Sequence, residues 1–354
     1  MSESTASGTT TGEATARPAV RPTIRMVAEL AGVSTATVSY VLSGRGTGGK
    51  GPGVKEETTQ RVRDAAEQLG YRPNQAARAV RTGKTQTVLL SMTMLRDPWS
   101  LEVVEAVSAA ARRHDLTPLI MADDDWNVAL ERNQADAVFI DAVRPEQRDA
   151  LSRLAGRGAK LVVFDSTVEP DGFDVVRSDD LGGCRELVEH LLDGWDDVAC
   201  LGPGASRTDR GRAAAFHAAL AARGTAAAAN RVADIEGTPE SAYAGALALL
   251  GQADRPRAVY ATSDYIAISA VHAAQSLGLE VGRDVAIAGV GNTLAGERLQ
   301  PPLTSAGPTN VLGAIAELMV DIATDQRAVG HLHDFPWKVW ERASTGHAAP
   351  LSAQ

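Results

Sequence analysis

Seven short runs of almost wholly apolar residues mark the sequence beyond residue 84, and stretches with helical spacing lie between most of them. A buried parallel strand reads as a continuous apolar run, because helices cover both faces of its sheet. Such runs alternating with helices predict an α/β fold. They are too many for one small sheet, so we expect two similar lobes around a cleft. The runs span residues 87–92, 117–122, 136–140, 160–165, 198–202, 258–262 and 285–290.

The composition limits the class of protein further. The chain of 354 residues is 44% hydrophobic, which is ample for a large core, and only 4% aromatic. Two cysteines, Cys184 and Cys200, supply neither a disulfide framework nor a metal-ligand cluster. No apolar run approaches the ~18 residues of a membrane span, and residues 1–20 lack the apolar core of a secretory signal. We therefore expect a cytoplasmic protein with a disordered tail over residues 1–21.

No motif predicts catalysis. The seven histidines show no HExxH or ligand spacing, and no local GxSxG motif is present. The segment LGPGASRTDRGR (201–212) lacks the GK[ST] ending of a phosphate-binding loop, so an ordinary strand-to-helix crossover is the favoured interpretation. We expect no enzyme activity, no cofactor and no metal.

Charge is distributed unevenly along the chain. Up to Lys84 there are 12 Lys and Arg residues against 7 Asp and Glu, whereas the remainder holds 23 against 37. A basic head on an acidic body is typical of a nucleic-acid-binding module fused to a different domain.

Two short helical patterns joined by a glycine lie in this basic head. Thr23 can cap a helix with apolar residues at Ile24, Val27, Ala28 and Ala31, and Gly32 can end it with a positive φ. Ser34 can cap a second helix, whose outer face is small or polar. A third helix fits residues 55–69, with Thr58, Val62, Ala65 and Leu69 inward. Together these predict a helix-turn-helix.

The motifs in the basic head, and others further along the chain, occur in the order of a known protein family. The order VAxxAGVSxxTVSxVL (27–42), followed by YxPNxxAxxxxxG (71–83), resembles the headpiece of the lac repressor family of bacterial transcription regulators (LacI/GalR type). Landmarks further on match that family in order: DPW, RSDDLGG, RGRAAAF, ATSD, PPLTS and ERAST. The resemblance implies an N-terminal all-α helix-turn-helix headpiece plus an α/β periplasmic-binding-protein-like body of two doubly wound lobes.

The resemblance also implies a recognition helix in the major groove. Thr35 and Ala36 stand where base specificity is usually set, and Tyr40 stands where many members have arginine. Arg25 is expected to contact phosphate. The full set of expected DNA-binding residues is Arg25, Ser34, Thr35, Ala36, Thr37, Ser39, Tyr40, Asn74, Ala77, Val80 and Arg81.

Two features depart from the family pattern. The loop at residues 45–53 is longer than usual, either as a tolerated insertion or with Arg45 and Lys50 at phosphate. The segment QAARAVRTG (75–83) is expected to form a hinge helix capped by Asn74, although a plain linker is the alternative. In the family, a hinge leucine wedges a base step in the minor groove. Val80 takes that position, which predicts a shallower kink or weaker binding.

The predicted domains follow from these assignments: a tail at 1–21, the helix-turn-helix domain at 22–70, the hinge at 71–84 and the body at 85–354. Within the body we expect a first lobe from about 85–182 and 310–337, and a second from about 183–306 and 338–354. The helix before Asp136 is about seven residues shorter than usual, which predicts a trimmed flank on the first lobe.

Ligands of α/β sheets bind at the carboxyl ends of strands. This rule and the resemblance together predict an effector site. Arg212 matches an arginine that holds hydroxyls or carboxylates, with a surface ion pair as the alternative. Asp165 is either a ligand contact or a strand-end turn residue, and Trp99 either stacks on the ligand or anchors the lobe surface. The expected effector-binding residues are Trp99, Asp165, Arg212, Ser263 and Gly291.

Three positions argue against a typical sugar effector. Ser263 replaces a frequent asparagine, Gly291 replaces a ligand-binding aspartate, and Gly237 replaces an aromatic platform. They predict either a bulkier or less hydroxylated effector, or a cleft that no longer responds.

The favoured function is a sequence-specific DNA-binding transcriptional regulator, and repression is the expected direction of regulation. It would bind a palindromic operator on the nucleoid as a homodimer and be modulated by a small molecule in the cleft between the lobes, for which a carbohydrate-derived compound is one candidate. The alternatives are a small-molecule (sugar-type) receptor without a DNA role, and an enzyme on a doubly wound fold.

Overall fold

The computed structural model describes residues 22–42, 54–93, 95, 97–122, 125–132, 134–177, 180–208, 211–228 and 231–346. The chain divides into two compact units, Met1–Gly83 and Lys84–Gln354. The predicted tail (1–21) and the glycine-rich loop (45–53) lie outside the described residues. Across the described part of the chain, no helix combines the length and apolar character that crossing a membrane requires.

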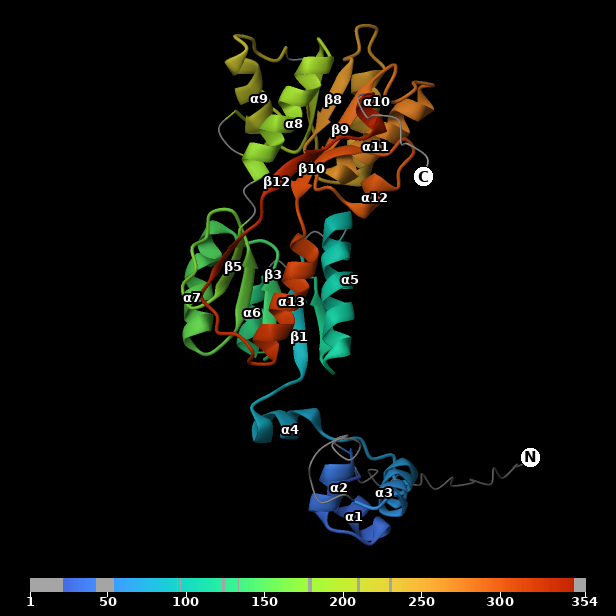
Figure 1. Cartoon of the computed structure of the whole chain (residues 1–354), viewed down its shortest axis with the longest axis vertical. Helices are drawn as coiled ribbons and strands as arrows, with labels where there is room; N and C mark the ends of the chain where they lie inside the picture. Colours follow the sequence, from blue (N-terminus) through green and yellow to red (C-terminus); the bar gives the residue numbers. More distant parts are fainter. Residues whose placement is uncertain are drawn as a thin grey trace, which may run out of the picture. The chain divides into compact units, whose positions relative to one another are not determined.

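The first unit is helical (Figure 1). Its helices are α1 (Ile24–Ala31), α2 (Thr35–Leu42), α3 (Glu56–Gln68) and α4 (Gln75–Thr82). The first three share one small core, to which each contributes valine or alanine side chains: Val27, Ala28, Ala31, Val38, Val41, Val62, Ala65 and Ala66.

The expected helix boundaries are confirmed with one correction. Thr23 Oγ1 accepts a hydrogen bond from the Met26 N–H at 3.4 Å, and Gly32 ends α1 with φ of 65°. On α3 the buried threonine is Thr59 and not Thr58, which is only half-buried. Both threonines precede Val62 by about one turn and lie near the same helix face, and Thr59 is the one that the core covers.

The second unit consists of two α/β lobes, each built on a six-stranded sheet (Figure 1). The first sheet has the order β11-β5-β4-β3-β1-β2, and every pair in it is parallel. Its strands are β1 (Thr87–Ser91), β2 (Thr117–Met121), β3 (Ala137–Ile140), β4 (Leu161–Phe164), β5 (Asp174–Arg177) and β11 (Leu332–Asp334). Its helices are α5 (Pro98–Arg113), α6 (Trp126–Arg132), α7 (Arg148–Gly156) and α13 (Val311–Ala323).

Alternating residues of the first sheet face two separate cores. Val88 and Leu90 point to the α5–α13 side, whereas Leu89 points to the α6–α7 side. The edge strand β2 differs, because its Leu119 and Ile120 are 47% and 50% exposed. This open edge, beside the seven-residue helix α6, agrees with the expected trimmed flank.

The second sheet has the order β12-β10-β9-β8-β6-β7 and is parallel except for the antiparallel pair β10–β12. Its strands are β6 (Val198–Gly202), β7 (Val232–Asp234), β8 (Ala258–Ala261), β9 (Ala286–Val290), β10 (Thr304–Pro308) and β12 (Trp337–Trp340). The helices are α8 (Asp180–Gly194) and α9 (Arg212–Ala222) on one face, and α10 (Pro239–Leu250) and α11 (Asp264–Ser276) on the other. The short helix α12 (Leu294–Glu297) follows β9.

The chain passes from one lobe to the other around the cleft. It leaves the first sheet after β5, returns with α13 after β10, and leaves again between β11 and β12 (Figure 1). Trp337, which we expected at the end of the first lobe, pairs with Pro308 in the second sheet. Helix α8 begins at Asp180 and packs on the second sheet, so that lobe also starts slightly before the expected residue 183.

Candidate functional site

The first candidate surface is the outer face of α2 in the helical unit. Ser34 Oγ accepts from the Thr37 N–H at 3.1 Å and shares a 2.9 Å hydrogen bond with Thr37 Oγ1, so both residues fix the start of the helix. Thr35 and Ala36 are exposed, and Ser39 and Tyr40 are half-buried. Val38 and Val41 point the other way into the core. The helix therefore presents a small, polar surface held by its own cap and core.

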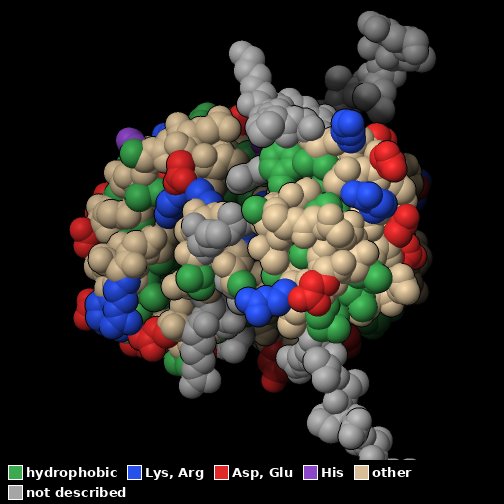
Figure 2. All heavy atoms as spheres, turned by 90° about the horizontal axis from the view of Figure 1, so that it is seen from below, with side chains coloured by type: hydrophobic (Ala, Val, Ile, Leu, Met, Phe, Trp, Pro, Cys, Tyr) green, Lys and Arg blue, Asp and Glu red, His purple; other side chains and the backbone are tan. Residues whose placement is uncertain are grey.

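Exposed arginines lie on the two helices that pack against α2. Arg25 on α1 and Arg61 and Arg63 on α3 are exposed. Figure 2 shows Lys and Arg side chains interspersed with Asp and Glu side chains over the face it presents. The exposed Arg25, Arg61 and Arg63 are side chains of this unit that can reach phosphate.

The segment after the third helix forms the expected short helix, α4. Asn74 Oδ1 accepts from the Ala77 N–H at 3.2 Å, and Gly83 ends the helix with φ of 67°. Ala77 is exposed, and the Val80 side chain is 89% exposed. An aliphatic side chain so fully in solvent contributes nothing to the core of this unit. The side chain of Arg81 lies outside the described residues.

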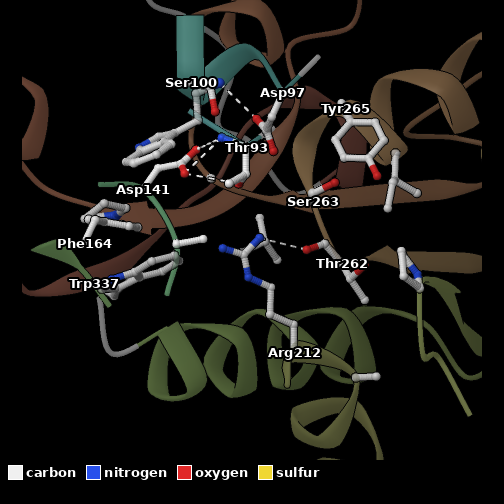
Figure 3. A pocket seen from close by; sticks show the side chains of 18 residues that line it. Thr93, Asp97, Ser100, Asp141, Phe164, Arg212, Thr262, Ser263, Tyr265 and Trp337 are labelled. Carbon is white, nitrogen blue, oxygen red and sulfur yellow. Dashed lines mark hydrogen bonds between the residues drawn. The ribbon is translucent and has the colours of Figure 1, made fainter. Parts of the chain in front are cut away.

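The second candidate site is a cavity of about 320 Å³ between the two lobes of the body (Figure 3). Four of the five expected effector residues line it: Trp99, Arg212, Ser263 and Gly291. Asp165 does not. Its Oδ1 accepts from the Thr167 N–H at 2.6 Å and the Val168 N–H at 2.9 Å, so it is the strand-end turn residue of our alternative interpretation.

Arg212 projects into the cavity from the first turn of α9 (Figure 3). Its Nε donates to Asp180 at 2.7 Å and its Nη1 donates to the Thr262 carbonyl at 2.9 Å. Burial works to lower the pKa of this guanidinium, but the adjacent Asp180 carboxylate outweighs it and the pKa is raised. Arg212 is therefore a fixed cation whose charge is already matched inside the protein.

Asp97 faces Arg212 from the opposite wall, at the start of α5 (Figure 3). Its Oδ1 accepts from the Trp99 N–H at 2.9 Å. Burial raises the pKa of Asp97 above the ordinary value, although the Trp99 N–H and the charge of Arg212 act against that shift. No described cation forms an ion pair with this carboxylate. The cavity thus holds a partly desolvated carboxylate that is hydrogen-bonded to the Trp99 N–H but has no ion-pair partner in the described part of the chain.

Aromatic rings form much of the remaining wall. Trp99 and Phe164 contact each other with ring centroids 4.5 Å apart. The Trp337 ring lies 5.9 Å from the Arg212 guanidinium carbon, and Tyr265 lines the far side. Sequence reasoning missed Phe164, Tyr265, Trp337 and Asp97, because strands and helices distant along the chain bring them together. The sole local signal was the position of Asp97 as a cap before a proline.

The carboxylate nearest the floor of the cavity, Asp264, is occupied by protein donors. One oxygen accepts from Thr293 N–H and Oγ1, at 2.7 and 2.9 Å, and the other accepts from Ser305 Oγ at 2.6 Å. Burial raises the pKa of Asp264 despite these bonds. Ser263, by contrast, is 6% exposed and its Oγ has no hydrogen-bond partner among the described residues.

One hydrogen bond joins the lobes beside the cavity. Glu102 on α5 accepts from the Leu294 N–H at the start of α12, at 2.6 Å. Burial raises the pKa of Glu102, and the neighbouring carboxylates of Asp264 and Asp97 raise it further, against the Leu294 N–H. The contact links the first turns of a helix in each lobe.

Comparison with known proteins identifies the family of the chain. The model of the "Bacterial regulatory proteins, lacI family" matches residues 23–74, and that of the "Periplasmic binding protein-like domain" matches residues 188–345. The HTH-type transcriptional repressor PurR of Erwinia tasmaniensis is 30% identical over 85% of this chain and 90% of its own. The HTH-type transcriptional regulator DegA of Bacillus subtilis is 28% identical over 81% of this chain and 87% of its own.

Solved structures show the same fold. A LacI-family transcriptional regulator from Silicibacter pomeroyi matches with a TM-score of 0.72 at 21% identity, over 92% of this chain and 99% of its own. The lac repressor bound to ONPG in its repressed state gives 0.68 at 21% identity, over the same shares of the two chains. The relatives are transcriptional regulators, and their helix-turn-helix corresponds to the α1–α2 pair. The chain belongs to the lacI family of bacterial regulatory proteins and carries that family's DNA-binding helix-turn-helix.

Proposed function

We propose that this chain is a sequence-specific transcriptional repressor that binds a palindromic operator as a homodimer. The observation that carries the proposal is α2, whose outward face is free of core contacts while its cap and inner valines hold it firmly. In this role α2 lies in the major groove. Thr35 and Ala36 meet base edges, with the Ala36 methyl suited to a thymine methyl, and Arg25 holds phosphate.

The hinge helix completes the proposed DNA contact. Asn74 and Ala77 form its first turn, and Val80 supplies the apolar side chain that enters the minor groove between base steps. The 89% exposure of Val80 supports this, since the side chain has no role inside its own unit. Valine is shorter than leucine by one methylene, so the proposed kink is shallow.

Dimerisation is proposed through the open edge of the first sheet. Among the described strands β2 pairs only with β1, and its Leu119 and Ile120 are about half exposed. An unpaired strand edge with apolar side chains is a surface that proteins ordinarily cover. A second copy of the chain would cover it and would supply the second headpiece that a two-fold operator needs.

Regulation is proposed to come from the cleft. A small molecule that favours one angle between the lobes shifts the population toward or away from the DNA-competent state. The glycines at 291 and 237 and the occupied Asp264 leave few groups for sugar hydroxyls. The effector is therefore less hydroxylated than a simple sugar, unless the cleft has lost its response.

The test is to recover DNA from fragmented genomic DNA of the source with purified full-length protein, without added ligand. We expect a few related palindromes whose half-sites lie in adjacent major grooves, and a linear fall of log affinity with log salt concentration. Ala36→Glu, which adds a negative charge on the exposed face of α2, should abolish recovery. Ala218→Glu, at an exposed alanine of α9, is the matched control. Equal recovery by both variants would refute the proposed role of α2.

A further inference from the structure

The aromatic residues of this protein are concentrated at the cleft. The chain is 4% aromatic overall, yet four of the 18 residues lining the cavity are Trp99, Phe164, Tyr265 and Trp337. Figure 3 shows Trp337 and Phe164 on the same side of the cavity, with Tyr265 across from them. Faces of this kind bind planar rings and organic cations better than they bind flexible polar chains.

The charges of the cavity favour a positive ligand. The Asp180 carboxylate balances the charge of Arg212, and the Thr262 carbonyl accepts one more of its N–H groups, so Arg212 attracts an anion only weakly. Asp141 also lines the cavity, and its two oxygens accept from the Thr93 N–H at 3.0 and 2.9 Å. Asp97 remains as a desolvated carboxylate that forms no ion pair with a described residue. Partial removal of a carboxylate from water is costly, and a ligand cation beside Asp97 would offset that cost.

The size of the cavity and its hydrogen-bonding groups limit the ligand further. About 320 Å³ is at the lower end of the ~300–1,000 Å³ range of ligand pockets, which fits one ring with a short side chain. The Ser263 Oγ and the Trp337 Nε1 are buried without hydrogen-bond partners among the described residues, and both belong to side chains that line the cavity. These groups can serve one or two polar atoms of a ligand, whereas a hexose presents five hydroxyls.

We propose that the cleft selects a planar aromatic ligand with a protonated amine, the amine held at Asp97 and the ring against Trp99, Phe164 and Trp337. This inference rests on the proposed regulator function, because it names the effector class of the same cleft. Asp97 is at the N-terminal end of α5, in the lobe opposite Arg212. Binding therefore acts on the start of the helix whose Glu102 joins the two lobes.

Three matched probes test the charge requirement with one ring: phenethylamine, 2-phenylethanol and phenylacetate. Each is titrated into the full-length protein while tryptophan fluorescence is followed, because Trp99 and Trp337 are in the cavity wall. We expect phenethylamine to bind at least about tenfold more tightly than the other two, which corresponds to ~1.4 kcal/mol. Tightest binding by phenylacetate, equal binding by all three, or no binding of phenethylamine would each overturn the proposal.

A pair of variants assigns the effect to one carboxylate. Asp97→Asn keeps the helix cap, since asparagine also caps well, and it should abolish the preference for phenethylamine while leaving 2-phenylethanol binding unchanged. Asp171→Asn removes an exposed carboxylate outside the cavity and should change nothing. A preference that persists in Asp97→Asn would contradict the role of Asp97.

Operator recovery is measured on the same preparation with and without phenethylamine, so the two proposals fail separately. Phenethylamine binding without operator recovery in either condition would contradict the regulator and leave the ligand class standing. Operator recovery without a preference for the amine would do the reverse.

Discussion

Gly291 shows at the scale of one residue why this cleft differs from one that reads sugar hydroxyls. It lies at the cavity with φ of 136°, a conformation that residues with a Cβ rarely adopt. A Cβ at this position would also lie 3.7 Å from the Asp264 carboxylate. The backbone conformation at this position therefore itself disfavours an acidic residue.

Gly291→Asp should therefore fail to create a sugar site. We expect the free energy of unfolding to fall by about 1–3 kcal/mol from the backbone strain, without binding of cellobiose. Denaturant unfolding and calorimetric titration measure the two effects. Gly313→Asp adds the same charge at an exposed helical glycine with open space around it, and serves as control. Unchanged stability together with cellobiose binding in Gly291→Asp would contradict this account.

At the scale of elements, the sequence predicted the strands that can be recognised from their own residues. All seven apolar runs became strands, because a short apolar run can be recognised without knowing its partner strands; six of them are largely buried, and β2 is the exposed edge strand. The strands β5, β7, β10, β11 and β12 were not predicted: they are three to five residues long and include Asp174, Arg177, Pro308 and His333. Their pairing, and not their composition, makes them strands.

The candidate sites also contain one part that the sequence predicted and one part that it did not. The helix-turn-helix and the hinge helix were predicted with their caps, since Thr23, Ser34 and Asn74 act within three residues of their partners. The aromatic wall of the cleft was not predicted, because Phe164 and Trp337 reach it through long-range packing.

The exposed valine of the hinge helix α4 leads to a prediction about DNA binding. Val80→Leu adds one methylene to a side chain already in solvent, so stability should stay within ~0.5 kcal/mol of the parent. Operator affinity should rise and the bend of the DNA should increase, because leucine fills an opened base step better than valine does. Fluorescence anisotropy and gel mobility of permuted fragments measure these quantities. Unchanged affinity and bend would show that Val80 does not enter the groove.

The exposed edge strand β2 leads to a prediction about dimerisation. Ile120→Asp should shift the protein from dimer to monomer in sedimentation velocity, because a carboxylate would be placed on the proposed apolar edge. Leu332→Asp is the matched control, since Leu332 is 38% exposed on β11 at the opposite edge of the same sheet. Dissociation by the control variant alone would place the interface elsewhere.

At the scale of the whole molecule, one ion cluster joins distant parts of the body. Asp325, just after α13, forms ion pairs with Lys84 and Lys160. The same lysines donate to the last carbonyls of α13, Lys84 to Ala323 at 2.7 Å and Lys160 to Ile322 at 3.1 Å. The first residue of the body is thereby fixed to the end of a largely buried helix.

This cluster predicts a contribution to acid stability. Hydrogen bonds from Lys160 and Lys84 lower the pKa of Asp325 to about 2. Its contribution is therefore complete above the unfolded pKa of 3.8 and is lost as the pH falls through about 2. Because the side chain is 57% exposed, we expect at most about 1 kcal/mol. Asp325→Asn should lower stability at pH 6 and narrow its difference from the parent at pH 2; an unchanged difference would contradict the assignment.

The position of Lys84 has a consequence for how far a signal travels. Helix α13 begins at Val311, in a groove that also includes Trp99 and Gly291, and ends where Lys84 holds its final carbonyl. Its 13 residues span ~20 Å as one stiff rod. A stiff helix that shifts as a rigid body carries a displacement of its first residue to its last. A shift that an effector imposes on α13 at the cleft would therefore reach Lys84, the first residue of the body, without any strand in either sheet having to slide.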